Sequence, residues 1–229
     1  DDGVLQDIRL VELMNRYGIR GTFNLNSALM ESGFAWIHEN GMMVKRLSPA
    51  EAAGLYDGHE IASHTLTHPY MHDLTESEIL RQMGEDKRAL EEMFGREVEG
   101  FAVPFEFYSQ QIADCAKASG FAYARMSECT GNYCPWQDRY YWKCGMFHLQ
   151  PQLRDFVVGF LETEEELALC QIVGHSYDLD AEDLWDTTEE IFQSVAGRED
   201  IWLATNLQLF HYLMAMSALD VADGCAVNR

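Results

Sequence analysis

The sequence predicts an α/β fold in which helices cover a largely parallel sheet. Two observations carry this prediction. Short apolar stretches of strand type alternate with segments of helical periodicity along nearly the whole chain. Capping residues precede several of the helical segments, and glycine follows several of them. Strands that are separated by helices pair in parallel, because each crossover returns the chain to the same end of the sheet.

Helix boundaries in the first half of the chain are marked by capping residues. Ser48 with Glu51, and Thr75 with Glu78, are capping boxes, in which side chains satisfy the free backbone N–H groups of the first turn. Apolar residues at helical spacing indicate an earlier helix that ends before Gly18. We therefore expect helices at 4–17, 48–55 and 75–94, and strands at 21–26, 59–63 and 100–104.

Elements in the second half of the chain follow from the same signals. Gly120 stops a helix that begins at Ser109, and Asn206 is expected to cap the last helix. Apolar runs flanked by polar residues indicate the strands. The expected strands are 121–125, 156–160, 171–174 and 201–205, and the expected helices are 109–119, 163–169, 181–196 and the segment after 206.

Polar residues stand at the ends of several expected strands. In folds with parallel strands, functional side chains gather at the carboxyl edge of the sheet. The residues at these ends are therefore the first candidates for function. They are Asn24, Asn26, His64, Arg125, His175, Thr205 and Asn206.

The composition indicates one acidic domain without a membrane span. The 229 residues, 47% of them hydrophobic, suffice for one sizeable core, and no linker or repeat divides the chain, so we expect a single domain over 1–229. No apolar run approaches the roughly 18 residues of a membrane span. The 38 acidic residues exceed the 16 basic ones, and the net charge of −22 repels phosphate backbones and anionic lipids. Nucleic-acid and membrane-surface roles are therefore disfavoured, and the oligomeric state stays open.

The strongest local signal for chemistry is the segment from His64 to His68, which follows the expected strand 59–63. Two imidazoles four residues apart face the same way if the segment forms one helical turn. Neutral imidazoles bind zinc at about 2.0–2.1 Å, and a third ligand would complete a site with an open position for water. Spacing alone leaves open the alternative of two surface histidines without a ligand.

Two further signals are the first residues of the chain and His175. Asp1 and Asp2 are adjacent carboxylates that repel one another, so one can bind a cation while the other acts as a base. Acidic pairs are also common on surfaces. A lone histidine is usually structural, but His175 follows an apolar strand, which makes it a candidate acid or base.

Together these motifs resemble the polysaccharide deacetylases of carbohydrate esterase family four, also called the NodB-homology domain. Asp1-Asp2-Gly3 is similar to the end of the first family motif, and the segment 64–68 is similar to the second, His-Ser/Thr-x-x-His. The segments 102–105 and 172–175 are similar to the third and last motifs. The four motifs keep the family order across nearly the whole chain. Further segments resemble a branch that includes the deacetylase-like domain associated with gellan lyase.

The resemblance implies both a fold and a metal centre. The fold would be a distorted, incomplete (β/α) barrel of about seven strands, here lacking the first, so that the natural N-terminus would lie upstream. Asp2, His64 and His68 would hold a divalent metal, Zn²⁺ or alternatively Co²⁺ or Ni²⁺. In this family the metal polarises the acyl carbonyl and lowers the pKa of a bound water, which Asp1 would deprotonate.

The resemblance also implies the remaining catalytic roles. His175 would protonate the leaving group, and the backbone N–H of Phe105 would help to stabilise the tetrahedral oxyanion. The arginine of the third family motif, which orients the base, is replaced by Ala102. Arg125 ends the next expected strand and could supply that guanidinium, or it could form a plain surface salt bridge. The fourth family motif is not evident, and its loose candidates are Asp138, Trp136 and Trp142.

The predicted function is metal-dependent hydrolysis of an N-acetyl, or less readily an O-acetyl, group on a carbohydrate substrate. One alternative is a catalytically impaired carbohydrate-binding relic, motivated by Ala102 and the missing first strand. Another is a metal-free hydrolase of non-peptide C–N bonds, against which the combination of Asp2 with two histidines argues. A cytoplasmic location is slightly favoured, and secretion stays open because the natural N-terminus would lie upstream.

Overall fold

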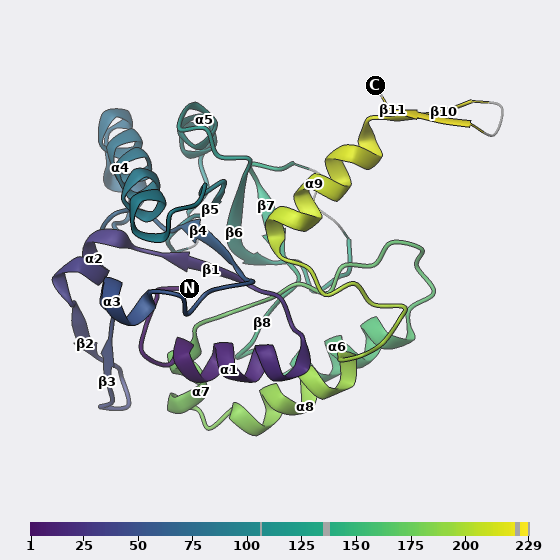
Figure 1. The fold of residues 1–229 in the computed structure, drawn as a ribbon, viewed down its shortest axis with the longest axis horizontal. Coiled ribbons are helices and arrows are strands. Elements are labelled where there is room, and N and C mark those ends of the chain that lie inside the picture. The colour runs from purple at the N-terminus through teal and green to yellow at the C-terminus, as the bar shows by residue number, and fades with distance from the viewer. Residues whose placement is uncertain (106, 135–137, 223–224, 229) are drawn as a thin grey trace.

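A five-stranded parallel sheet forms the centre of the protein (Figure 1). The structure is a computed structural model and describes residues 1–105, 107–134, 138–222 and 225–228. In spatial order the strands are β1 (Thr22–Leu25), β4 (Glu60–Ser63), β5 (Gly100–Ala102), β6 (Tyr123–Cys129) and β7 (Trp142–Cys144). Each pairs in parallel with its neighbour. A separate parallel pair consists of β8 (Met146–Phe147) and β9 (Ile172–Val173).

Helices lie on both sides of these strands. Figure 1 shows α4 and α5 on one side, and α1, α6, α7 and α8 on the other. The helices are α1 (Asp7–Tyr17), α2 (Ser27–Ser32), α3 (Pro49–Ala52), the 3-10 helix η1 (Met71–Asp73), α4 (Glu76–Phe94), α5 (Gln110–Ala118), α6 (Leu153–Glu162), α7 (Ser176–Ala181), α8 (Trp185–Val195) and α9 (Asn206–Ser217). Within the described ranges, none of them is both long and apolar enough to cross a membrane.

Two antiparallel hairpins lie outside the central sheet, and the sequence did not predict either of them. The first consists of β2 (Ala35–Ile37) and β3 (Met43–Lys45), and the second of β10 (Leu219–Ala222) and β11 (Cys225–Asn228). The second hairpin follows α9 and extends away from the sheet (Figure 1). The first hairpin bears on the site, because the segment that follows β3 pairs with residues 3–5 near the start of the chain.

This architecture confirms the α/β fold class and a distorted, incomplete barrel. The seven parallel strands divide into a sheet of five and a pair, so within the described residues they form no continuous ring. Residues 1 and 2 lie between these two groups. The backbone N–H of Asp2 donates to the Asn24 carbonyl in β1 at 2.8 Å, and the backbone nitrogen of Asp1 donates to the Gly174 carbonyl after β9 at 3.0 Å.

Apolar side chains from the sheet and from the surrounding helices form the main core. Each fully buried large aliphatic or aromatic side chain contributes about 1.5–3 kcal/mol to stability, so this cluster fixes the strand ends that carry the site. Its central members are Phe23, Leu25, Ile61, Met83, Leu90, Phe101, Val103 and Ile112.

Both predicted capping boxes are confirmed. Ser48 Oγ accepts the backbone N–H of Glu51 at 3.3 Å, and Thr75 Oγ1 accepts that of Glu78 at 3.4 Å. In each case the glutamate also accepts the N–H of the capping residue. The helix that begins at Ser48 is shorter than predicted, because it ends at Ala52 instead of continuing to residue 55.

Several predictions for the second half of the chain are wrong. The run 156–160, predicted as a strand, lies in helix α6, since a short apolar run alone does not distinguish a buried strand from the buried face of a helix. The predicted helix at 163–169 and strand at 201–205 are irregular segments. The predicted helix 181–196 is α8 alone, preceded by the separate α7. Thr205, not Asn206, caps α9, with its hydroxyl accepting the N–H of Gln208 at 3.2 Å.

Candidate metal centre and active site

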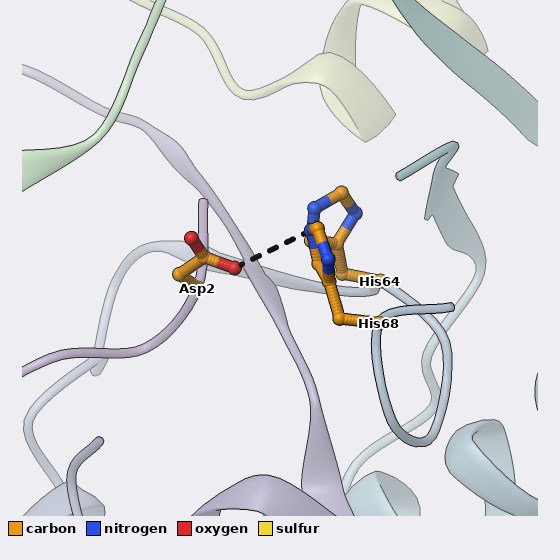
Figure 2. Close-up of side chains that lie close together, drawn as sticks. All are labelled: Asp2, His64 and His68. Carbon is orange, nitrogen blue, oxygen red and sulfur yellow. Dashed lines mark ion pairs between the residues drawn. The ribbon is translucent and has the colours of Figure 1, made fainter. Parts of the chain in front are cut away.

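Three potential metal-ligand side chains converge at the carboxyl edge of the sheet. His64 follows β4 directly, His68 stands four residues later, and Asp2 is bound through its backbone to β1. One ligand atom of each residue lies within 4.8 Å of those of the other two. Asp2 Oδ1 is 3.7 Å from His68 Nε2, and Figure 2 shows the carboxylate facing both imidazole rings.

Hydrogen bonding and burial make these three side chains suitable for a metal ion. His64 Nδ1 lies 2.8 Å from the carbonyl oxygen of Ala102, to which it must donate, so its Nε2 keeps a free lone pair. Burial lowers the pKa of both His64 and His68, which keeps the imidazoles neutral. Asp2 Oδ1 is buried, and Arg46 Nη1 lies 2.8 Å from it as an ion-pair partner. Two neutral imidazoles and one carboxylate fit a zinc-type ion with an open coordination position.

Left-handed backbone conformations are concentrated around these ligands. Such conformations cost on the order of 1–3 kcal/mol each and persist only where surrounding contacts enforce them. Here Thr65 Oγ1 accepts the N–H of His68 at 3.1 Å, and the Asn26 side chain donates to the Thr65 carbonyl at 2.8 Å. Four of the five described non-glycine residues with positive φ lie at this site: Asp2, Thr65, His68 and Phe105.

The carboxylate of Asp1 is held by two polar side chains. Asn24 Nδ2 donates to Asp1 Oδ1 at 2.6 Å, and Arg125 Nη2 donates to the same oxygen. The Arg125 side chain is only 2% exposed, so the surface salt bridge considered as the alternative is excluded. Arg125 is the register partner of Ala102 on the neighbouring strand. The predicted contact between Arg125 and Asp1 is therefore confirmed. The guanidinium comes from β6, which lies next to the strand that carries Ala102.

His175 lies next to the metal-ligand group. It caps α7, and its Nδ1 is 3.0 Å from Asp178 Oδ2, which also lies 2.9 Å from His148 Nε2. Burial alone would raise the pKa of Asp178, but the hydrogen bonds from the two histidines hold it well below its usual value. His175 Nε2 then faces Asp2 Oδ2 at 4.0 Å. These two histidines and Asp178 form a second group of potential metal ligands.

Aromatic rings contact His68 of the metal-ligand group and the neighbouring His175. The Phe105 ring packs against His68 at 4.6 Å and stacks on Tyr70 at 3.9 Å, and Tyr70 is half exposed. Tyr177 stacks on His175 with ring centroids 4.8 Å apart. Phe105 thus lies at the site as predicted, although the role expected of its backbone N–H stays a prediction.

The family model described as polysaccharide deacetylase matches residues 1–124, which are more than half of the 229 residues. The chain belongs to the polysaccharide deacetylase family. The match includes Asp1, Asp2, His64 and His68, and it ends before Arg125 and His175, whose placement rests on the structure alone.

Solved structures of similar fold belong to the same family. A putative polysaccharide deacetylase from Mycobacterium smegmatis has a TM-score of 0.68 at 15% identity, with coverage of 93% of this chain and 78% of that one. The CE4 domain of a multidomain xylanase from the hindgut metagenome of Trinervitermes trinervoides has a TM-score of 0.61 at 16% identity, covering 94% and 88%. A CE4 family pseudoenzyme from Bacillus anthracis has a TM-score of 0.56 at 14% identity, covering 90% and 60%.

Sequence similarity to curated proteins is weaker. The uncharacterized protein YlxY of Bacillus subtilis is 24% identical over 108 residues, which are 47% of this chain and 30% of that protein. The chain thus spans less than a third of this relative's length. The resemblance to the gellan-lyase-associated branch stays a prediction.

Three residues of this candidate site were missed by sequence reasoning. Asp178 stands three residues after His175 at the start of a helix, a spacing that could have suggested the pair. His148 and Arg46 stand alone in the sequence, and no spacing points to either. Arg46 forms a buried ion pair with Asp2, at 2.8 Å between Nη1 and Oδ1.

The two described candidates for the fourth family motif, Asp138 and Trp142, have other contacts. Trp142 is buried and packs against Tyr123 at 5.2 Å between ring centroids. Asp138 accepts the backbone N–H of Tyr140 in a loop. Trp136 lies outside the described residues. The carboxylate that contacts His175 is instead that of Asp178.

Proposed function

We propose that this protein is a metal-dependent carbohydrate deacetylase, which hydrolyses an N-acetyl or O-acetyl group on a sugar. The single observation that supports it most is the convergence of the Asp2–His64–His68 group with the Asp1 carboxylate, which Arg125 holds, and with His175. These groups can supply a Lewis acid, a base and an acid around one acyl group.

Asp2, His64 and His68 would hold the metal, which is Zn²⁺ in this proposal, with Co²⁺ or Ni²⁺ able to replace it. When bound, it would polarise the acyl carbonyl and promote ionisation of the attacking water. The hydrogen bond from His64 Nδ1 to the Ala102 carbonyl orients the ring before metal binds.

Asp1 would take the proton from the attacking water. The guanidinium of Arg125 and the amide of Asn24 both donate to its Oδ1, which favours the ionised carboxylate and leaves Oδ2 available for the proton. Arg125 would in this way replace the guanidinium that Ala102 cannot provide.

His175 would complete the reaction by giving a proton to the departing nitrogen or oxygen as its bond to the acyl carbon breaks. Asp178 accepts from Nδ1, so Nε2 is the atom that faces the substrate side of the site. The backbone N–H of Phe105 would stabilise the oxyanion. The products are acetate and a free amine or hydroxyl on the sugar.

The experiment that tests this proposal measures acetate released from N-acetylated and O-acetylated oligosaccharides. Chelator-treated protein should be inactive and should regain activity with Zn²⁺, Co²⁺ or Ni²⁺. Asp1→Asn should keep the contact with Arg125 but lose about 10²–10⁴ in rate, the scale of a positioned base. Asp73→Asn, at a carboxylate that is 71% exposed, is the matched control and should be fully active.

A catalytically impaired carbohydrate-binding relic is the second candidate. Arg46 favours it, because a buried guanidinium already neutralises Asp2. The fold is also shared with a CE4 family pseudoenzyme. In that case the protein would release no acetate with any of the three metals. Acetate release that persists after chelation would instead indicate a metal-free hydrolase.

A further inference from the structure

Arg46 reaches the metal-ligand group because two backbone segments run side by side. Residue 46 follows β3 and forms an antiparallel bridge with Val4. The N–H of Leu47 donates to the Gly3 carbonyl at 2.8 Å, and that of Leu5 donates to the Lys45 carbonyl at 3.0 Å. This pairing sets Arg46 next to residue 2, where Nη1 donates to the Asp2 carbonyl oxygen and contacts its carboxylate.

The guanidinium is fixed in this position by burial and by an aromatic ring. The side chains of Arg46 and Asp2 are 4% and 7% exposed, and the Trp36 ring lies 5.1 Å from the guanidinium carbon. Because both side chains are buried, the charge of the Asp2 carboxylate is compensated by the guanidinium, whose Nη1 lies 2.8 Å from Oδ1. Arg46 is therefore the counter-charge of Asp2.

The same carboxylate oxygen faces both the guanidinium and the histidines. Asp2 Oδ1 lies 2.8 Å from Arg46 Nη1 and 3.7 Å from His68 Nε2. Arg46 therefore neutralises the charge of the same oxygen that faces His68. A divalent ion bound by Asp2 would stand close to a fixed positive charge that competes for the same anion.

We propose that Arg46 is a built-in counter-cation of the metal site, which weakens metal binding and stabilises the metal-free protein. This inference rests on the proposed function, because it requires that the group of Asp2, His64 and His68 binds a metal. Removing one partner of a buried ion pair leaves the other uncompensated. Without Arg46, Asp2 would be a buried, unpaired anion whose natural partner is the metal, and the stability of the protein would become metal-dependent.

The test measures zinc affinity of the metal-free full chain by competition with a chromophoric chelator at one fixed pH. Arg46→Met removes the charge and keeps an unbranched side chain. Its dissociation constant for zinc should be about 10–100-fold lower than that of the unmodified protein, the range typical for residues beside metal ligands. Arg16→Met is the matched control, because Arg16 is 62% exposed and its ion-pair partner is Glu189. The zinc affinity of this variant should be unchanged.

Thermal unfolding gives a second readout that does not depend on activity. Metal-free Arg46→Met should unfold at a lower temperature than the metal-free unmodified protein. Saturating zinc should raise the unfolding temperature of the variant by more than it raises that of the unmodified protein. Arg46→Gln is the variant to use if Arg46→Met does not fold, because it can still donate to the Asp2 carbonyl without carrying a charge. It should also bind zinc more tightly.

Zinc binding by both variants that is equal to or weaker than that of the unmodified protein would overturn the inference, since Arg46 would then support Asp2 as a ligand. The proposed function would survive that outcome. If neither the unmodified protein nor the two variants bound zinc, the metal centre and the counter-cation would both be wrong.

Discussion

At the scale of single residues, His175 depends on one carboxylate oxygen that it shares with His148. His148 Nε2 and His175 Nδ1 both lie within 3.0 Å of Asp178 Oδ2. The contact with Asp178 fixes which nitrogen of His175 faces Asp2, because Nδ1 is taken by Asp178 and Nε2 lies 4.0 Å from Asp2 Oδ2. His175, the proposed acid, is thus held by Asp178 and lies outside the group of Asp2, His64 and His68, the proposed metal ligands.

We predict that His175→Gln keeps its metal and loses about 10²–10⁴ in the rate of acetate release, the usual scale for a positioned acid. The amide can still hydrogen-bond to Asp178, but it cannot act as a proton donor of the same strength. Elemental analysis and acetate assays on the same preparation check both parts. His211→Gln, at an exposed position of α9, is the control and should change neither. Metal loss in His175→Gln would make this residue a ligand instead.

At the scale of elements, Asp86 connects helix α4 to the two segments that carry the site. Its Oδ1 accepts the backbone N–H and the hydroxyl of Ser27, at 2.8 and 2.6 Å, and its Oδ2 accepts the hydroxyl of Ser63 at 2.6 Å. Ser63 directly precedes His64. Burial raises the pKa of Asp86 to about 6, even though these hydrogen bonds favour the charged form.

This raised pKa predicts a pH-dependent contribution to stability. Because the folded state holds the Asp86 proton more tightly than the unfolded state, with its pKa near 3.8, this contribution is complete below pH 3.8 and is lost as the pH rises through 6. The advantage of the unmodified protein over Asp86→Asn should shrink by roughly 2 kcal/mol between about pH 4.5 and about pH 7.5. Urea unfolding of both proteins measures it, with Asp114→Asn as an exposed control. A constant difference would contradict the raised pKa.

The elements also show which sequence signals are sufficient. The capping boxes at Ser48 and Thr75 predicted helix starts correctly, because a capping box is a local arrangement of hydrogen bonds that needs no partner elsewhere. The run 156–160 was assigned wrongly, because its apolar residues fit both a buried strand and the inner face of α6. The segment 201–205 has strand composition but no neighbouring strand within the described residues. Whether such a run forms a strand depends on pairing with a distant segment, which the local sequence does not specify.

At the scale of the whole molecule, the site is assembled from positions across more than 170 residues, from Asp1 to His175. The alternation of strands and helices predicted that polar residues at strand ends would meet, and Asn24, His64, Arg125 and His175 do meet there. Arg46 could not be predicted, because its contact with Asp2 comes from an irregular antiparallel bridge beside the sheet. Motif order is thus visible in the sequence, whereas the charges that surround the motifs are visible only in the fold.

The measurement that tests this account most directly is anomalous diffraction from crystals of the protein grown with zinc, recorded above and below the zinc edge. The account predicts one strong anomalous peak about 2.0–2.2 Å from a carboxylate oxygen of Asp2 and from the Nε2 atoms of His64 and His68. A peak that lies only among His148, His175 and Asp178, or no peak at Asp2 from crystals that contain zinc, would contradict the proposed catalytic centre.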